Sequence, residues 1–189
     1  MYRKCTTEKA SAQQRQFQNA LLQSMLQIPY GEITVTGLCT QTGLSRKTFY
    51  RLFENKDDVL NALIDHTLQE MDACLRHDAV YAELVRVFRY WKEKKALLDA
   101  VSRNNKTVLL LERALLLTTF EDRQMLQAMD AVDDPHQQQI VLFLLCGIMG
   151  QIIYWHHTGF GFSEEEMAAL STRLLVYPPL RVLNPEENI

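Results

Sequence analysis

A short basic stretch holds the residues of this sequence that could do the most specific chemistry. Arg46, Lys47, Tyr50, Arg51 and Lys56 offer guanidinium, ammonium and phenol donors close together along the chain. Such donors bind the phosphates of a nucleic acid, and an arginine or lysine near the start of a helix can reach the acceptor atoms of guanine in a major groove. The pattern therefore indicates binding of a polyanion rather than catalysis.

The distribution of charge along the chain supports this interpretation. The 189 residues carry a formal net charge of −3. Residues 1–56 hold eight basic and three acidic residues, a net charge of +5, whereas the remainder holds 12 basic and 20 acidic residues, a net charge of −8. A basic head on an acidic body predicts a polyanionic partner for the head alone. Chance variation of charge over a short segment is the alternative.

A glycine turn between two short helical segments positions the basic side chains. Residues 34–42 form the first segment, with Thr34 as its N-cap. Gly43 suits the left-handed C-cap that ends such a helix, and Ser45 can cap a second helix that runs to about residue 52. We therefore expect a helix, a glycine turn and a second, basic helix.

The second helix needs a neighbour, because a helix of this length is not stable alone in water. Phe49, Leu52 and Phe53 recur at helical spacing and form one apolar side. When that side docks on a preceding helix, the cationic side chains point outward. Two helices joined by a glycine turn, the second basic and exposed, describe a helix-turn-helix with a recognition helix.

The remaining sequence is helical as well. Helical spacing of apolar residues, together with capping signals, predicts further helices over residues 8–28, 56–75, 78–95, 96–102, 107–132, 134–158 and 163–177. No strand pattern or repeat is present in the sequence. We expect an all-α fold of about nine helices, with an N-terminal three-helix helix-turn-helix domain over residues 1–56 and a larger helical C-terminal domain over residues 57–189.

The sequence offers no pattern for catalysis, for a metal ion or for another cofactor. The cysteines are scattered without a CxxC spacing, which favours free thiols in a reducing compartment: Cys5, Cys39, Cys74 and Cys146. Serine, histidine and acidic residues do not form a catalytic constellation, and no glycine-rich phosphate loop is present. We expect no enzyme activity.

No segment of the sequence predicts a membrane location. The first residues do not read as a signal peptide, and the most apolar run, residues 140–155, is shorter than the roughly 20 residues that span a bilayer. We expect a soluble, cytoplasmic protein with no membrane partner.

The residues around the glycine turn resemble the TetR family of bacterial transcriptional regulators. The resemblance is carried by Ile33-Thr34-Val35, Cys39, Gly43-Leu44-Ser45, Thr48-Phe49-Tyr50, Phe53 and Asn55-Lys56-Asp57-Asp58-Val59-Leu60. It implies a DNA-binding head over residues 1–56 and a helical body over residues 57–189 that dimerises and binds an effector. Near the C-terminal end, Phe143-Leu144-Leu145-Cys146-Gly147 and Ile153-Tyr154-Trp155 resemble a subgroup that includes regulators of dihydroxyacetone metabolism.

The resemblance and the basic helix together predict the residues that contact double-stranded DNA: Thr34, Thr36, Ser45, Arg46, Lys47, Thr48, Tyr50, Arg51 and Lys56. The two threonines of the first helix would touch the backbone or a base edge, residues 45–48 would read or flank bases, and Tyr50 and Lys56 would hold phosphates. Lys47 stands where the family commonly has a small residue, and Gly37 replaces a polar one, so the base preference stays open.

The apolar run at residues 140–155 predicts a dimer. A helix that is apolar nearly all round must be buried on every side, and Gly147 and Gly150 would allow a second helix to approach closely. We expect a two-fold four-helix interface between residues 134–177 of two copies, using Phe143, Gly147, Gly150, Ile153, Met167, Leu170 and Leu174. The alternative is that the core of a single chain covers this helix.

The middle helices supply candidate residues for a small-molecule effector pocket: His66, Phe88, Arg89, Trp91, Arg113, Leu116, Phe120 and Tyr154. Core packing of the apolar residues and solvation of the charged ones is the alternative. The resemblance to the family, in which repression is the usual outcome, thus implies a repressor that binds a palindromic operator as a homodimer and is released by an unknown small-molecule effector. The alternative is a co-activator or partner-binding regulator of the same fold without an inducer.

Overall fold

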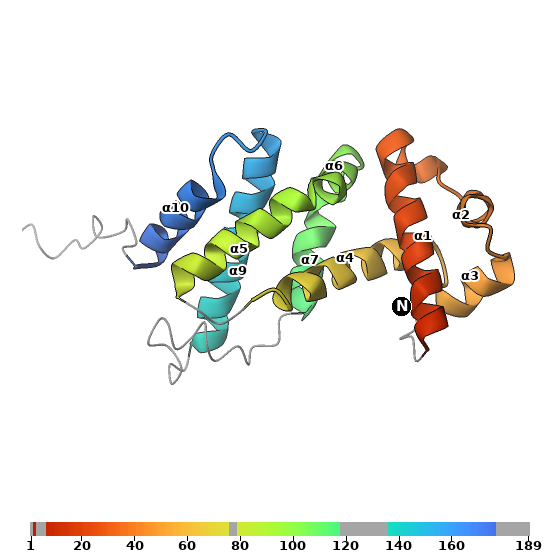
Figure 1. Ribbon diagram of the computed structural model, residues 1–189, viewed down its shortest axis with the longest axis horizontal. Coiled ribbons are helices and arrows are strands. Elements are labelled where there is room, and N and C mark those ends of the chain that lie inside the picture. The colour runs from red at the N-terminus through yellow and green to blue at the C-terminus, as the bar shows by residue number, and fades with distance from the viewer. Residues whose placement is uncertain (1, 3–6, 76–78, 118–135, 177–189) are drawn as a thin grey trace, which may run out of the picture. The chain divides into compact units, whose positions relative to one another are not determined.

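The computed structural model describes residues 2, 7–75, 79–117 and 136–176, apart from the side chains of residues 137, 175 and 176. These residues form nine α-helices and one 3₁₀ helix, with no strand among them, which confirms the all-α prediction (Figure 1). The elements are α1 (Glu8–Gln27), η1 (Tyr30–Glu32), α2 (Val35–Thr42), α3 (Arg46–Leu52), α4 (Lys56–Asp72), α5 (Val80–Glu93), α6 (Lys95–Arg103), α7 (Thr107–Leu117), α9 (Gln137–His157) and α10 (Glu164–Val176).

The chain forms two compact units. Unit 1 comprises Met1–Ala73 and Lys94–Thr119, and unit 2 comprises Cys74–Glu93 and Phe120–Ile189. The division differs from the boundary expected at residue 56, because α4 and α6 pack on α1, and α7 packs on α4 and α6, all within unit 1. The assignment of residues 1–56 to DNA binding stays a prediction about function.

Unit 1 is held together around α1 by a cluster of three aromatic rings. Phe17 of α1 meets Phe49 and Phe53 edge-on, with ring centroids 5.2 and 6.2 Å apart, and all three side chains are buried. Edge-to-face contacts of this kind add to the free energy gained by burying the rings. The helix α3, too short to be stable alone, is thereby fixed on α1.

Local capping sets the boundaries of the short helices, as the sequence predicts. Thr34 Oγ1 accepts a hydrogen bond from the Gly37 N–H at 3.0 Å, and Ser45 Oγ accepts one from the Thr48 N–H at 3.1 Å. Gly43 ends α2 with φ of 69°, a left-handed conformation that costs glycine little.

Unit 2 is built from α5, α9 and α10. The ring of Phe88 in α5 meets the buried indole of Trp155 in α9 at 5.6 Å. α10 packs along α5 and begins with a capping box: Ser163 Oγ accepts from the Glu166 N–H at 3.2 Å, and Glu166 Oε2 accepts from the Ser163 N–H at 2.7 Å. Ser171 Oγ donates to Gln151 Oε1 at 2.5 Å and so joins α10 to α9.

Four of the predicted helices, over residues 78–95, 107–132, 134–158 and 163–177, include positions outside the described residues. The helix expected over residues 107–132 is described as far as Leu117, and the start expected at Asp134-Pro135 lies outside the described residues. η1 was not predicted. Pro29 precedes it, and its end is closed by a hydrogen bond from the Ile33 N–H to the Tyr30 carbonyl at 3.2 Å.

Candidate nucleic-acid interface

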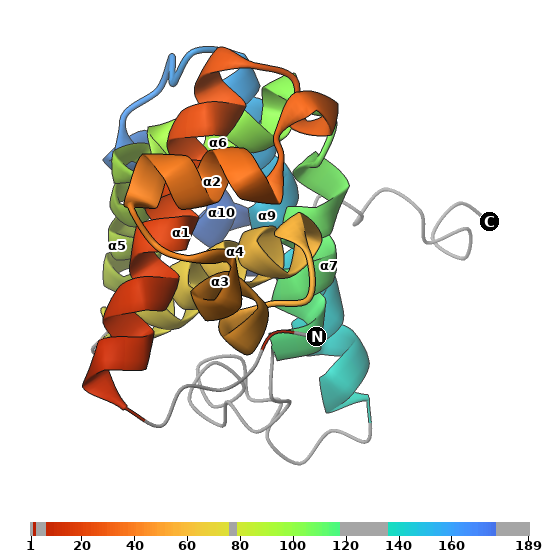
Figure 2. The same ribbon diagram turned by 90° about the vertical axis from the view of Figure 1, so that its right-hand side faces the viewer.

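The structure presents α2 and α3 at the surface of unit 1. Figure 2 shows both helices in front of α1 when the end of the unit that carries them faces the viewer. Leu38 and Cys39 of α2, and Phe49 and Leu52 of α3, are buried, so each helix has one face docked and one face outward. This arrangement leaves the outward faces available to a partner.

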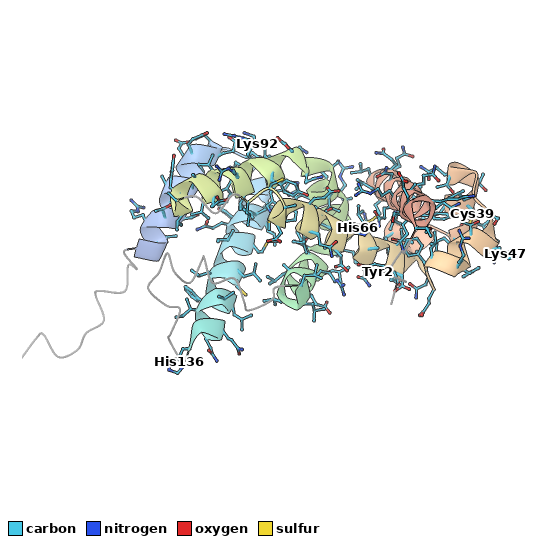
Figure 3. All side chains as sticks on the ribbon, turned by 60° about the horizontal axis from the view of Figure 1, so that its bottom comes forward. Tyr2, Cys39, Lys47, His66, Lys92 and His136 are labelled. Carbon is cyan, nitrogen blue, oxygen red and sulfur yellow. The ribbon has the colours of Figure 1, made fainter. Side chains whose placement is uncertain are left out.

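Most of the expected DNA-binding residues lie on that outward side. Arg46 and Lys47 occupy the first turn of α3 and are exposed, and Lys47 stands at the outer edge of its unit (Figure 3). Thr34 and Thr36 at the start of α2 are exposed too. The start of α2 and the first turn of α3 thus place hydroxyl and cationic groups at one surface.

Ser45 is exposed and Thr48 is half-buried, and both belong to the cap of α3. Ser45 Oγ lies 3.0 Å from Thr48 Oγ1, in addition to accepting the Thr48 N–H, so both hydroxyls take part in the N-cap of α3. Further along the helix, Tyr50 is 48% exposed, and its ring lies edge-on to Phe49 at 5.4 Å. Arg51 is exposed and donates from Nη2 to Gln13 Oε1 at 2.6 Å.

Lys56 is used differently from the sequence prediction. Its Nζ donates to the carbonyls of Tyr30, Gly31 and Ile33 at 2.6, 3.2 and 2.9 Å, and it lies 4.7 Å from the centre of the Tyr30 ring. An ammonium group has three N–H donors, so all of them are engaged with the backbone. In this geometry Lys56 fastens η1 and the segment that leads into α2 to the start of α4, and it has no donor left for a phosphate.

Replacing Lys56 by methionine is therefore expected to reduce stability. The stem is retained but three charge-assisted hydrogen bonds are lost, so we expect the free energy of unfolding to fall by about 1.5 to 3 kcal/mol in urea denaturation. Lys47→Met is the matched control, because that side chain is exposed and its loss should change stability by no more than about 0.5 kcal/mol. An unchanged urea midpoint for Lys56→Met, with a weaker salt dependence of DNA binding, would restore the phosphate role.

Asn104 makes a second connection to η1 that the sequence did not reveal. Its Oδ1 accepts from the Tyr30 N–H at 2.7 Å, while its Nδ2 donates to the carbonyls of Met25 and Ala100 at 3.0 and 2.8 Å. Burial raises the pKa of the Tyr30 phenol, as does its hydrogen bond to Asp57. The end of α1, η1 and the end of α6 are thus joined inside unit 1.

The eight residues expected to line an effector pocket are divided between the two units. His66, Arg113 and Leu116 belong to unit 1, Phe88, Arg89, Trp91 and Tyr154 belong to unit 2, and Phe120 lies outside the described residues. Phe88 and Trp91 are fully buried, whereas Leu116 and Tyr154 are exposed. The pocket stays a prediction.

Each of the three expected polar anchors already has a partner. His66 Nδ1 lies 2.9 Å from the Gln18 amide nitrogen, and burial lowers the pKa of the imidazole, helped by the charge of Arg15. Arg89 pairs with Glu165 at 3.4 Å, with both side chains more than half exposed. These contacts account for the positions of the His66 and Arg89 side chains without a bound ligand.

Arg113, the third anchor, belongs to a buried polar cluster that links α4, α7 and Tyr2. Its Nε donates to Asp65 Oδ1 at 2.7 Å and its Nη2 donates to Asp65 Oδ2, which also accepts from the Tyr2 phenol at 2.8 Å. Asp65 is 1% exposed. Burial raises the pKa of Tyr2, and so does the neighbouring carboxylate, so the phenol remains a donor. The sequence did not predict this pair.

The expected dimer residues fall into exposed and buried groups. Phe143, Gly147 and Gly150 lie on an exposed side of α9, and Phe143 is 78% exposed. Leu170 and Leu174 of α10 are exposed at 37% and 39%. Ile153 is half-buried, and Met167 is buried within unit 2, so Met167 does not form part of the exposed face.

The opposite side of α9 is packed within unit 2, through Val141, Leu144, Met149, Ile152 and Trp155. Among the described helices, this one is long and apolar enough, by length and composition, to cross a membrane from Gln138 to His157, and 28% of that stretch is buried.

The described residues contain no group of three or more histidine, cysteine or acidic side chains that could hold a metal ion. Of the cysteines in that part of the chain, Cys39 is buried, and burial raises the pKa of its thiol, while Cys74 and Cys146 are exposed. Cys5 lies outside the described residues.

The described helices have the fold of the TetR-family regulators, as the sequence resemblance implied. No protein-family model matches the chain, and no curated protein matches it in sequence. The likeness therefore comes from solved structures, and at their low sequence identity it shows the fold.

Three solved structures illustrate the likeness. The dihydroxyacetone kinase operon activator DhaS matches with a TM-score of 0.60 and 18% identity, over 86% of this chain and 93% of that one. The fatty acid degradation regulator FadR from Bacillus halodurans gives a TM-score of 0.62 and 16% identity, over 94% and 99%. A protein described as a TetR-family transcriptional regulator from Syntrophomonas wolfei gives 0.66 and 15%, over 92% and 99%.

Proposed function

We propose that this protein is a transcriptional regulator that binds double-stranded DNA through α2 and α3. The observation that carries the proposal is the recognition helix itself: Arg46, Lys47 and Tyr50 are exposed on a helix whose aromatic side is buried on α1. A helix presented in this way fits a major groove, with its first turn nearest the bases. The likeness to solved regulators of the same fold supports this reading over an enzyme.

We further propose that the protein acts as a homodimer on a palindromic operator. Phe143, Gly147, Gly150 and Tyr154 of α9 recur at helical spacing and are all exposed. A Cβ atom added to either glycine would meet no neighbour within 4 Å, so a second copy could approach this side closely. Two recognition helices about 34 Å apart would then read half-sites one turn of DNA apart.

A dimer would also shield the exposed apolar side of α9 from water. A second subunit would cover its exposed side, and the ionisable His156 and His157 would remain at its end. If the protein instead partitioned into a membrane fraction when expressed alone, the dimer proposal would be replaced by insertion of α9.

We also keep three expectations from the sequence as part of the proposal. The protein represses transcription, a small-molecule effector releases it from DNA, and it is located in the cytoplasm. An effector can change operator affinity only if it binds the two conformations of the regulator differently. We assign it no residues, because the polar anchors expected for it are engaged elsewhere. DhaS is described as an operon activator, which supports activation as the second candidate for the regulatory outcome.

The test is DNA binding by a double variant of the recognition helix. We expect Arg46→Ala with Lys47→Ala to weaken binding to duplexes that the wild type enriches from a random-sequence library, or to DNA beside its own coding sequence. Two lost base contacts of about 1 to 3 kcal/mol each correspond to a loss of at least about 30-fold in affinity. Fluorescence anisotropy at fixed salt measures it.

A matched control removes the same charge from elsewhere. Arg89 and Lys95 are exposed and pair with Glu165 and Asp99, so Arg89→Ala with Lys95→Ala should leave affinity within about twofold while changing net charge equally. Equal losses in the two double variants would mean that binding depends on overall charge alone, and readout by α3 would be rejected.

A further inference from the structure

Arg51 differs from Arg15 and Arg113, two other arginines of unit 1, in the chemistry of its side-chain partner. Its Nη2 donates to Oε1 of Gln13, an uncharged amide on α1, at 2.6 Å, and the contact lies at the surface. By contrast, Arg15 pairs with the carboxylate of Glu70 at 3.3 Å, and Arg113 with that of Asp65. A carboxylate neutralises the guanidinium that it holds, whereas an amide fixes the group and leaves its charge intact.

The remaining donors of Arg51 stay available. A guanidinium has five N–H donors in a fixed planar fork, and the bond to Gln13 uses one of them. Within the described part of the chain, the group therefore keeps its positive charge and four further donors next to the exposed face of α3. This is what a backbone phosphate requires of its partner.

Gln13 itself is well placed to hold the side chain still. It stands four residues before Phe17 on α1, hence on the same side of that helix, and Phe17 is the ring that packs on Phe49 and Phe53. The hydrogen bond from Arg51 to Gln13, which acts as a tether, thus lies near the place where α1 is packed on α3. An arginine that is already oriented loses less side-chain entropy when it binds.

We propose that Gln13 is a positioning residue for DNA binding, which orients Arg51 toward a backbone phosphate of double-stranded DNA without reducing its charge. The inference rests on the proposed function and adds to it a residue on α1, outside the two helices α2 and α3. Gln13 acts through Arg51 and is not itself a contact to the bases.

The test compares two substitutions of Gln13 with a control on the same helix. Gln13→Ala removes the tether but leaves Arg51 charged, so affinity for the enriched duplex should fall about two- to tenfold, with the slope of log K against log salt unchanged. Gln13→Glu keeps the acceptor but neutralises the guanidinium, so the slope should become shallower by about 0.9, one phosphate's worth. Gln16→Ala, at an exposed position of α1, should bind as the wild type does.

A double-mutant cycle separates positioning from a general effect on α1. In an Arg51→Ala background, Gln13→Ala should change affinity by less than about twofold, since the group that it orients is gone. Thermal unfolding of each variant should match that of its background, because the contact is exposed.

Three results would overturn the inference while DNA binding stands: wild-type affinity in Gln13→Ala, the same loss with and without Arg51, or an undiminished salt slope in Gln13→Glu. If the wild type enriches no duplex at all, the proposed function fails and this inference fails with it. The two failures are therefore distinguished by the wild-type measurement.

Discussion

Replacing Arg113 by alanine is expected to destabilise unit 1 by about 3 to 5 kcal/mol, a large part of the stability of an ordinary domain. The loss comes from the partner that remains. Asp65 is 1% exposed, and in the wild type the Arg113 guanidinium holds both of its carboxylate oxygens. Without Arg113, the buried carboxylate keeps, among the described residues, the hydrogen bond from Tyr2 alone. Urea denaturation followed by circular dichroism measures the change.

Two further variants show whether burial is the cause. Arg89→Ala breaks an arginine–carboxylate pair of which both side chains are 55% exposed, so it should cost no more than about 1 kcal/mol. Arg113→Met combined with Asp65→Leu removes both charges and should recover most of the stability lost in Arg113→Ala. If Arg113→Ala and Arg89→Ala were equally mild, the Asp65–Arg113 pair would not be buried as described.

The short-range features of this fold could be predicted from the sequence because their partners are close in the chain. Thr34, Ser45 and Ser163 each accept a hydrogen bond from an N–H three residues later, and Gly43 has the left-handed conformation that ends α2. Such motifs depend on residue type and spacing, and both are visible in the sequence. The order and type of the elements followed from them.

The long-range contacts could not be predicted, and they decide what the charged residues do. Lys56 has the residue type and position of a phosphate ligand, but its ammonium is engaged by carbonyls 23 to 26 residues earlier. From the sequence alone, Arg113 is interpreted as a solvated or ligand-binding cation. In the structure, the packing of α4 on α7 brings Asp65, 48 residues away, beside it. Periodicity identifies the face on which a residue lies, but not its partner.

Introducing a charge at Gly150 is expected to separate the proposed dimer. Gly150→Glu should cause no clash within the chain, since a Cβ atom there meets nothing within 4 Å, and glutamate favours a helix more than glycine does. Across a two-fold interface, however, the new carboxylate would face its own copy or be buried without a partner. At a cost of about 3 to 5 kcal/mol, the dissociation constant of the dimer should rise roughly 150- to 5,000-fold. Sedimentation equilibrium at micromolar concentration measures the shift from dimer to monomer.

Operator binding should fall with the dimer, because two linked recognition helices bind a palindrome far more tightly than one. Gln139→Glu is the control: it adds the same charge to an exposed position of α9, near the start of the helix, and should leave both assembly and DNA affinity unchanged. The folded monomer should unfold at no lower a urea concentration, which separates lost assembly from lost structure. Either of two results would show that this face of α9 is not where two copies meet: a wild type that sediments as a monomer, or a Gly150→Glu variant that dimerises normally. The regulator would then need another way to bring two recognition helices to one palindrome.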